Sequence, residues 1–301
     1  GFCDVPGTKI IVFYPHGGVS AVQQAQMATQ AGENVCVCAV RGNFDDAQTG
    51  VKKIFSAVSK DQLLEGKGVR LSSANSINIG RLAPQVVYYY RAYADLVQAG
   101  RIQPGDKVDY VVPTGVRIGD ADRVRQRQMC IRDSYKTVSP SMDILVSSNL
   151  ERLLYLLSGD DKLIADLMKQ LSENGEYEVP ADMLEKLHEL FWAGFCDDEG
   201  AKTAIGKVWK DDHYLCDTHT AVAWDVAQQY KQANPEHNAV VVLSTASPYK
   251  FPAAVLEGIG EKAEGDEFDV MERLHKVTGV PVPKNLADLR SRAVRHRDVI
   301  D

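Results

Sequence analysis

The sequence lacks the long apolar run that a membrane-spanning helix needs, and its first residues do not have the pattern of a signal peptide. Its six cysteines include no C-x-x-C pair and no disulfide-type spacing, which predicts a reduced, cytoplasmic setting. The net charge of −7 leaves no overall positive field for a nucleic acid. We therefore expect neither a nucleic acid nor a membrane as a partner.

Several catalytic signatures are also missing. The sequence contains no G-x-G-x-x-G or Walker pattern and no nucleophile elbow, so Gly17 and Gly18 predict a tight turn rather than a phosphate loop. His213, Cys216 and His219 follow an H-x-x-C-x-x-H spacing, but the second ligand pair typical of a structural zinc site is absent. We expect no metal ion and interpret this segment as a connection between elements.

The composition is that of a globular protein, because 301 residues with 45% apolar and 25% charged side chains allow one large domain or two ordinary ones. The first 70 residues alternate between strand and helix patterns, which predicts a small α/β unit with parallel strands. The expected elements are a strand at Lys9–Tyr14, a helix capped by Ser20, a strand at Val35–Val40, and a helix to about Val58 capped by Asp45 or Asp46.

A central stretch combines a polar turn, an amphipathic helix and a short apolar strand. Apolar residues recur on one helical face from Ile79 to Val97, with Pro84 placed in the first turn. Val108–Val112 is too short and too β-branched for a helix and predicts a buried parallel strand. The stretch ends at Gly115, where the carboxyl edge of an α/β sheet holds phosphates and cofactors.

The second half predicts further helices and one more strand. Ala239–Leu243 is expected to form a second buried strand that ends at Ser244 and Thr245. The helices are expected at about 144–157 capped by Asp143, at 160–175 and 180–193, from Asp197 onward, from Thr218 to Gln229, and at 268–277 and 285–296.

Four blocks together resemble threonine synthase, and they stand in the order of that family. They are Asn75–Arg81 (NSINIGR), Val111–Gly115 (VVPTG), Tyr135–Ile144 (YKTVSPSMDI) and Leu243–Phe251 (LSTASPYKF). The resemblance covers nearly the whole chain except about residues 116–134, but only the later part of the enzyme. The family's segment with the lysine that forms the Schiff base to pyridoxal phosphate would lie before Gly1.

The resemblance implies a two-domain α/β fold with mostly parallel sheets and flanking helices. This is the fold-type II arrangement of tryptophan synthase beta-like enzymes that use pyridoxal phosphate, here incomplete. It assigns residues 1–70 to a small domain. Residues 71–301 would form the large domain that binds pyridoxal 5'-phosphate, with a helical insertion at about 143–195.

The resemblance also implies an activity, the conversion of O-phospho-L-homoserine and water to L-threonine and phosphate, with the cofactor as electron sink. Asn75, Ser76 and Arg81 match the family's contacts to the substrate phosphate, a task that suits arginine's planar fork. Thr245 matches the hydroxyl that faces the pyridine nitrogen, and Gly115 matches the edge of the cofactor's phosphate loop. No lysine stands in the Schiff-base context, so no catalytic residue is assigned and we expect the 301 residues to be inactive.

Residues 116–134 depart from the family, which continues here with a Gly-Asn-Phe-Gly-Asp loop. Their five arginines have no amphipathic period and are typical of a solvated basic loop. A second interpretation is that Arg125–Asp133 translates the end of a transposon adapter used in sequencing libraries. Our hypothesis is that about 116–134 are such an artefact, in which case their positive charge says nothing about nucleic acids.

Two other classes of function stay open. One is a different pyridoxal-phosphate lyase of the same fold, for which Arg81 with Ser76 favours a phosphate-bearing substrate. Assays with serine-type substrates would discriminate it. The other is a non-catalytic α/β binding fragment, which the missing lysine allows.

Overall fold

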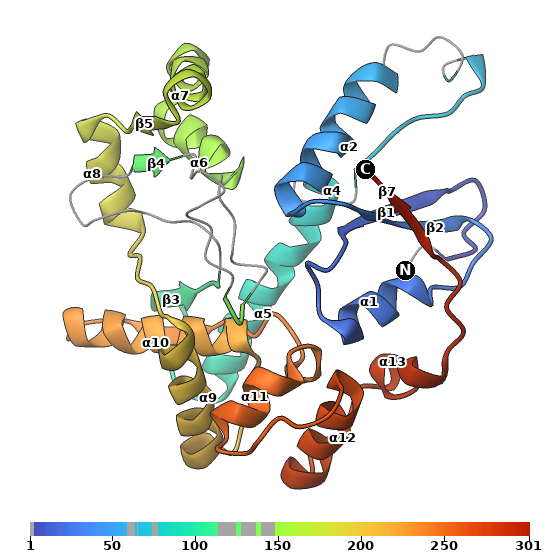
Figure 1. Cartoon of the computed structure of the whole chain (residues 1–301). Helices are drawn as coiled ribbons and strands as arrows, with labels where there is room; N and C mark the ends of the chain where they lie inside the picture. Colours follow the sequence, from blue (N-terminus) through green and yellow to red (C-terminus); the bar gives the residue numbers. More distant parts are fainter. Residues whose placement is uncertain are drawn as a thin grey trace. The chain divides into compact units, whose positions relative to one another are not determined.

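The computed structural model describes residues 3–58, 64, 66–73, 78–113, 125–127, 137–139 and 148–301. Within these ranges, helices flank short and mostly parallel sheets, which confirms the predicted α/β class (Figure 1). The chain forms two compact units. Unit 1 contains Gly1–Ala74, Val208–Asp217 and Ser247–Asp301, and unit 2 contains Asn75–Lys207 and Thr218–Ala246.

This division differs from the expected one at residue 70, because Ser247–Asp301 groups with the first unit. The cause is a C-terminal strand, β7 (Asp298–Ile300), which pairs in parallel with β2 (Val35–Val40). A pairing between segments so distant in sequence leaves no local periodicity that a sequence-based division could use.

Unit 1 is built on a three-stranded parallel sheet in the order β1 (Ile10–Pro15), β2, β7. The bounds expected for β2 are confirmed, and β1 lies one residue later than predicted. Val37 and Ala39 of β2 are 1% and 2% exposed and cluster with Tyr14 of β1. Figure 1 shows β7, in red, beside β2, so the last residues of the chain complete the sheet that the first residues begin.

The helix α1 (Ala21–Ala28) begins as predicted. The Ser20 side chain accepts a hydrogen bond from the backbone N–H of Gln23 at 3.2 Å, and the Gln23 side chain accepts one from the Ser20 backbone at 3.2 Å. These two bonds form a capping box, in which orphan donors of the first turn are satisfied reciprocally. The predicted Ser20 cap is confirmed.

The helix α2 (Phe44–Val58) begins earlier than predicted. Asn43 Oδ1 accepts a hydrogen bond from the N–H of Asp46 at 2.9 Å, and Asp46 Oδ2 accepts one from the N–H of Asn43 at 2.8 Å. The prediction that Asp45 or Asp46 caps this helix was wrong, because the asparagine ahead of them offers an equally good side-chain acceptor.

The C-terminal part of unit 1 consists of short helices followed by β7. They are η4 (Pro248–Lys250), α11 (Pro252–Gly258), α12 (Glu267–Thr278), α13 (Lys284–Ala287) and η5 (Leu289–Ser291). The helix predicted at 268–277 is confirmed as α12. Of the helix predicted at 285–296, only the short pieces α13 and η5 form, since the chain extends after Ser291. The N–H groups of Arg295 and His296 both donate to the carbonyl oxygen of Ala28, at 2.9 and 3.1 Å, and hold this segment extended.

In unit 2, the helix predicted between 79 and 97 consists of three pieces. These are α4 (Ile79–Leu82), the 3₁₀ turn η1 (Ala83–Gln85) and α5 (Val86–Gln98). Pro84 lies in η1, where its missing N–H and fixed φ favour a tighter turn over a continuous α-helix. No residue of the three pieces is buried, and Ile79 and Tyr90 are 74% and 73% exposed. The apolar period therefore predicted the helix correctly but not its burial.

The strands β3 (Val108–Val111) and β6 (Ala239–Val242) pair in parallel, as predicted. All their residues are half-buried, so the prediction of buried strands was wrong. The described parts of the chain contribute no third strand to this sheet, and a two-stranded sheet cannot enclose its own residues. The helix α10 (Thr218–Ala233), which follows α9 (Asp198–Asp212), packs against both strands.

The expected helical insertion forms a cluster with its own core. It contains α6 (Ser148–Ser158), α7 (Asp161–Asn174), β5 (Glu176–Glu178) and α8 (Ala181–Leu190). Leu154, Tyr177, Met183 and Leu187 are at most 2% exposed and pack together there. Their mutual packing explains why helix periodicity predicted this region well.

The proposed artefact at 116–134 stays a hypothesis, because only Arg125–Arg127 of it is described. These three residues form β4, which pairs antiparallel with β5. The backbone register places Arg125 opposite Glu178 and Arg127 opposite Glu176.

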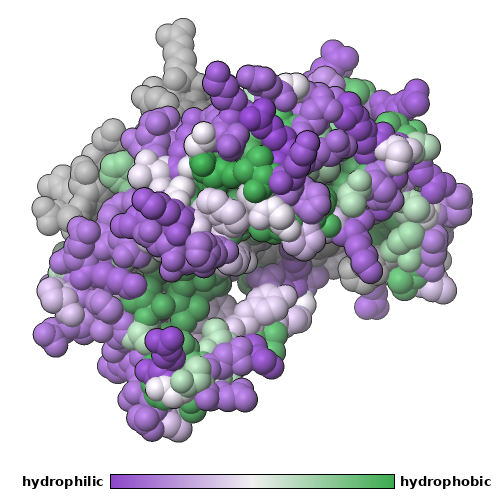
Figure 2. Space-filling model, turned by 90° about the horizontal axis from the view of Figure 1, so that it is seen from below, coloured by the Kyte–Doolittle hydropathy of each residue, from purple (hydrophilic) through white to green (hydrophobic). Residues whose placement is uncertain are grey.

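On the face that Figure 2 shows, hydrophilic residues predominate and apolar residues gather in a few patches. None of the helices in the described ranges has the length and apolar character needed to cross a membrane.

Candidate functional site

The carboxyl end of the β3–β6 pair is where the sequence predicts ligand contacts. Val111 lies opposite Val242, and the N–H of Leu243 donates to the carbonyl oxygen of Val111 at 3.0 Å. The ladder therefore continues one residue past β6, and Ser244 and Thr245 follow directly at the sheet edge. Both residues are exposed, so the Thr245 hydroxyl is accessible to a ligand at the edge where α/β sheets bind cofactors.

At the opposite end of the pair, three side chains form what we call the amino-end clamp: Asp109, Tyr230 and Asn238. Asp109 Oδ2 accepts from the Tyr230 hydroxyl at 2.8 Å and from the Asn238 N–H at 3.1 Å, and Asp109 Oδ1 accepts from the Asn238 side-chain amide at 3.0 Å. Partial burial acts to raise the pKa of Asp109, but the hydrogen bonds from Asn238 and Tyr230 outweigh it and hold this pKa below its usual value. The clamp joins β3 to α10 through Tyr230 and to the residue before β6 through Asn238.

A second contact, the carboxyl-end anchor, joins Thr220 of α10 to Ser244. The Thr220 hydroxyl donates to Ser244 Oγ at 3.2 Å. Thr220 belongs to a run of buried polar residues at the start of α10, with Asp217, Thr218 and His219 at most 4% exposed. A buried run of this kind is unusual for polar residues and indicates a helix start held firmly in the interior.

Arg81 lies in α4, at the head of the α4–η1–α5 segment, and its side chain is exposed. Asn78 begins α4 by accepting a hydrogen bond from the N–H of Gly80 at 2.9 Å. Tyr110 of β3 ties this segment to the sheet, because its hydroxyl donates to the carbonyl oxygen of Tyr89 in α5 at 2.8 Å. The strand that leads to the sheet edge is thus bonded to α5, which follows α4 and η1 along the chain.

Three of the predicted site residues, Asn75, Ser76 and Gly115, lie outside the described residues. Arg81 and Thr245 are described, and both belong to unit 2. The roles assigned to all five stay predictions.

The H-x-x-C-x-x-H spacing does not assemble into a cluster of ligands. His213 is exposed with φ of 53°, whereas Cys216 and His219 are buried. Burial raises the pKa of the Cys216 thiol to about 12, which disfavours the thiolate that a metal ion requires. Within the described ranges, no group of three or more His, Cys, Asp or Glu residues could hold a metal ion.

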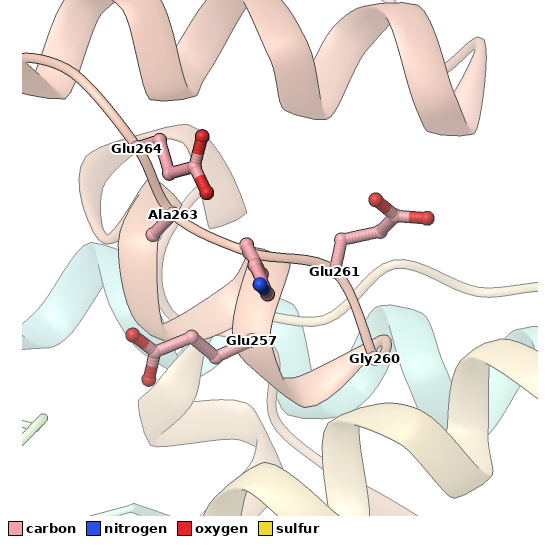
Figure 3. A pocket seen from close by; sticks show the side chains of 6 residues that line it. Glu257, Gly260, Glu261, Ala263 and Glu264 are labelled. Atoms are coloured by element: carbon pink, nitrogen blue, oxygen red, sulfur yellow. The ribbon is translucent and has the colours of Figure 1, made fainter.

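Unit 1 contains a cavity of about 470 Å³ at the end of α11, but its lining does not suit a phosphorylated substrate. It is lined by Glu257, Gly260, Glu261, Lys262, Ala263 and Glu264. Figure 3 shows the carboxylates of Glu257, Glu261 and Glu264 pointing in different directions, and Glu261 pairs with Arg273 at 2.9 Å. The dispersed negative charge repels anions and does not converge on a cation.

Sequence reasoning did not find the residues of the clamp or the role of Thr220. Asp109 lies inside an apolar strand, and Tyr230 and Asn238 are more than a hundred residues away along the chain. The only sequence signal is a carboxylate in a predicted buried strand, which requires partners because buried charges are seldom left alone.

Comparisons with known proteins agree on one family. The family model "Threonine synthase, C-terminal" matches residues 220–300. The chain is 33% identical to threonine synthase of Pseudomonas aeruginosa over 325 residues, covering 98% of this chain and 66% of that protein. It is 34% identical to threonine synthase-like 1 of Homo sapiens over 286 residues, covering 83% of this chain and 37% of that protein.

A solved structure supports the same assignment. The pyridoxal-phosphate-bound threonine synthase of Brucella melitensis matches with a TM-score of 0.76 and 30% identity, over 99% of this chain and 63% of that one. The chain thus spans from 37% to 66% of the length of these three relatives. The fold expected from the four sequence blocks is confirmed. Sequence identity, the family model and the shared fold together place this chain in the threonine synthase family.

Proposed function

We propose that this chain carries the part of a threonine synthase that binds pyridoxal 5'-phosphate and O-phospho-L-homoserine. The whole enzyme would convert this substrate and water to L-threonine and phosphate, the last step of threonine biosynthesis. The observation that supports this most is the exposed hydroxyl of Thr245 directly after β6, in a chain whose B. melitensis relative is a pyridoxal-phosphate-bound threonine synthase. A cytoplasmic location belongs to the proposal, supported by free cysteines in the described chain.

The residues at the sheet edge fit the cofactor chemically. The Thr245 hydroxyl can donate a hydrogen bond to a pyridine nitrogen, and because it is neutral it leaves that nitrogen less protonated than a carboxylate would. Gly115, beyond the described end of β3, would allow close backbone approach to the cofactor phosphate. When bound, pyridoxal phosphate supplies an electron sink for carbanion chemistry.

For the substrate phosphate, the proposal assigns Asn75, Ser76 and Arg81. Arg81 is exposed at the start of α4, and a guanidinium can offer two parallel charge-assisted hydrogen bonds to a phosphate. Serine and asparagine side chains add neutral donors that fix the orientation of the phosphate without further charge.

Turnover requires a lysine in the family's cofactor-binding context, and none of the 301 residues stands in that context. We therefore expect this polypeptide, assayed alone, to bind the cofactor without forming a covalent bond and to release no phosphate from O-phospho-L-homoserine. Measured phosphate release by the purified chain would contradict the expected inactivity while supporting the enzyme family.

Cofactor binding is tested by fluorescence titration of the purified chain with pyridoxal phosphate. We expect Thr245→Val to weaken binding roughly fivefold, the effect of one lost hydrogen bond. Thr203→Val, which changes an exposed threonine of α9 in the same unit, is the matched control and should leave the affinity unchanged. Equal affinities for all three proteins would reject the role of Thr245, and no binding at all would reject the cofactor.

Substrate binding is tested by calorimetry with O-phospho-L-homoserine and with O-phospho-L-serine. We expect Arg81→Gln to weaken binding of the first ligand by about 10- to 100-fold, because a charge-assisted contact is lost. Arg91→Gln, on the exposed face of α5, is the control. Preference for O-phospho-L-serine would favour the related lyase, and binding of neither ligand would favour the non-catalytic fragment.

A further inference from the structure

The helix α10 contacts the β3–β6 pair at both ends. Tyr230 reaches Asp109 in the amino-end clamp, and Thr220 reaches Ser244 in the carboxyl-end anchor. Ten residues of helix span about 15 Å, and the chain from Asn238 to Ser244 spans about 20 Å when extended. The two contacts are therefore about one strand length apart, and together they align the strand along the helix.

The two contacts differ in what they can contribute to stability. Asp109 is a partly buried carboxylate that accepts three hydrogen bonds, so removing a partner leaves a charge poorly solvated. Ser244 is exposed, and water can replace Thr220 as its partner at little cost in free energy. The hydrogen bond between Thr220 and Ser244 therefore adds little stability, but it still restricts the directions in which these two side chains can point.

We propose that Thr220 is a positioning residue for the cofactor's ring contact, because it holds Ser244 against the first turn of α10 and thereby orients Thr245. Thr220 is 6% exposed and lies in a buried helical turn, where a β-branched side chain keeps one or two rotamers. Ser244 precedes Thr245 directly, so a restraint on one residue limits the backbone of the next. Binding contacts require placement to about half an ångström, which a loose strand end does not give.

The identity of the ligand in this inference rests on the proposed function, but the ordering of Thr245 does not. The opposing interpretation is that the Thr220 hydroxyl only satisfies its own hydrogen-bonding need inside the protein. The two interpretations differ in one respect: only the first couples Thr220 to the side-chain rotamer of Thr245.

The test uses the full chain with ¹³C-labelled threonine methyl groups and no cofactor. The Thr245 methyl resonance is assigned with Thr245→Ser, and its order parameter is measured in the unmodified chain, Thr220→Val, Thr220→Ser and Tyr230→Phe. We expect one ordered rotamer in the unmodified chain and in Thr220→Ser, which keeps the hydroxyl, and an averaged rotamer in Thr220→Val. Tyr230→Phe breaks the contact at the other end and should leave Thr245 ordered.

A double-mutant cycle combines Thr220→Val with Ser244→Ala. We expect Ser244→Ala alone to average the Thr245 rotamer as Thr220→Val does. The double variant should lose no more order at Thr245 than either single variant. An unchanged Thr245 order parameter in Thr220→Val would overturn the proposal, as would equal loss of order in Tyr230→Phe. Global loss of folding in Thr220→Val is recognised from all other methyl resonances, and then Ser244→Ala, at an exposed position, decides.

A second readout adds pyridoxal phosphate labelled with ¹⁵N in its ring. We expect the bound nitrogen resonance to move toward that of the free cofactor in Thr220→Val, with affinity weakened about two- to fivefold, and to be restored in Thr220→Ser. If the unmodified chain does not bind the cofactor, the proposed function fails. The methyl experiment still decides whether Thr220 orders Thr245.

Discussion

The parallel strand pairs β1–β2 and β3–β6 are held together by different means. In unit 1, the centre of β2 is buried, with Val37 and Ala39 almost completely covered. In unit 2, every residue of β3 and β6 is half-buried, and the pair is joined at its ends by side-chain hydrogen bonds from α10. Burial stabilises the first pair, whereas polar contacts that set register and direction distinguish the second. The second pair carries the proposed binding edge.

The largest expected effect comes from a charge placed in each pair. Val37→Asp should destabilise unit 1 by more than about 4 kcal/mol, because it buries an unpaired carboxylate. Val241→Asp, at a half-buried position of β6, should cost about 1 to 2 kcal/mol, since water still reaches the side chain. Hydrogen exchange read by mass spectrometry assigns each loss to its unit. Similar losses in both variants would contradict the difference in burial.

The next effect concerns the amino-end clamp. Asp109→Asn should lower the free energy of unfolding of unit 2 by about 2 kcal/mol, because it removes the charge that strengthens three hydrogen bonds. Urea denaturation followed by tryptophan fluorescence measures it, since Trp192 lies 5.6 Å from the ring of Tyr230. Asp95→Asn, at an exposed residue of α5, is the control and should change stability far less. If Asp109→Asn left the free energy of unfolding unchanged, the clamp would not contribute to the stability of the β3–β6 pair.

The same clamp predicts a dependence on pH. The pKa of Asp109 is lower in the folded chain than its ordinary value of 3.8. Its stabilising contribution is therefore present above that ordinary value and is lost as the pH falls through the lower folded-state pKa. Urea denaturation at pH values from 6 to roughly 2 measures the free energy of unfolding. It should fall with pH in the unmodified chain and fall less in Asp109→Asn. Parallel profiles for the two proteins would rule out Asp109 as the titrating group.

The smallest effect tests the link between α5 and β3. Tyr110→Phe removes the hydroxyl that donates to the carbonyl oxygen of Tyr89 but keeps the ring, whose centroid lies 5.0 Å from that of Tyr89. We expect a loss of about 1 kcal/mol, measured by urea denaturation. The comparison is Tyr93→Phe in α5, the helix that also contains Tyr89. It removes a hydroxyl that accepts a hydrogen bond from the N–H of Gly105. A loss several times larger would mean that the hydroxyl matters for more than one hydrogen bond.

Local patterns predicted the elements well where the elements are stabilised locally. The Ser20 cap, the bounds of β2 and the helix α7 follow from capping chemistry, β-branched runs and helical periodicity. The four family blocks predicted the fold correctly. They also pointed to Thr245, which the structure places just after β6 at an exposed position.

The remaining features depend on contacts that a sequence pattern does not contain. The helix expected at 285–296 gives way to an extended segment because Ala28 accepts its backbone donors. The burial expected for β3 and β6 failed because periodicity reports which residues are apolar, not whether another layer covers them. The clamp at Asp109 was missed for the same reason, since its partners are brought together only by the strand register.

The strand β7 has a consequence for the order of events during protein synthesis. β2 ends at Val40, yet its neighbour Asp298–Ile300 leaves the ribosome only after the roughly 250 residues between the two strands have been translated. At bacterial or eukaryotic rates of about 5 to 20 residues per second, the edge of β2 waits more than about ten seconds for its partner. During that time its unpaired N–H and C=O groups can pair with other chains. A chaperone that shields nascent strands would therefore protect this protein most at β2, although the strand that completes this edge is the much later β7.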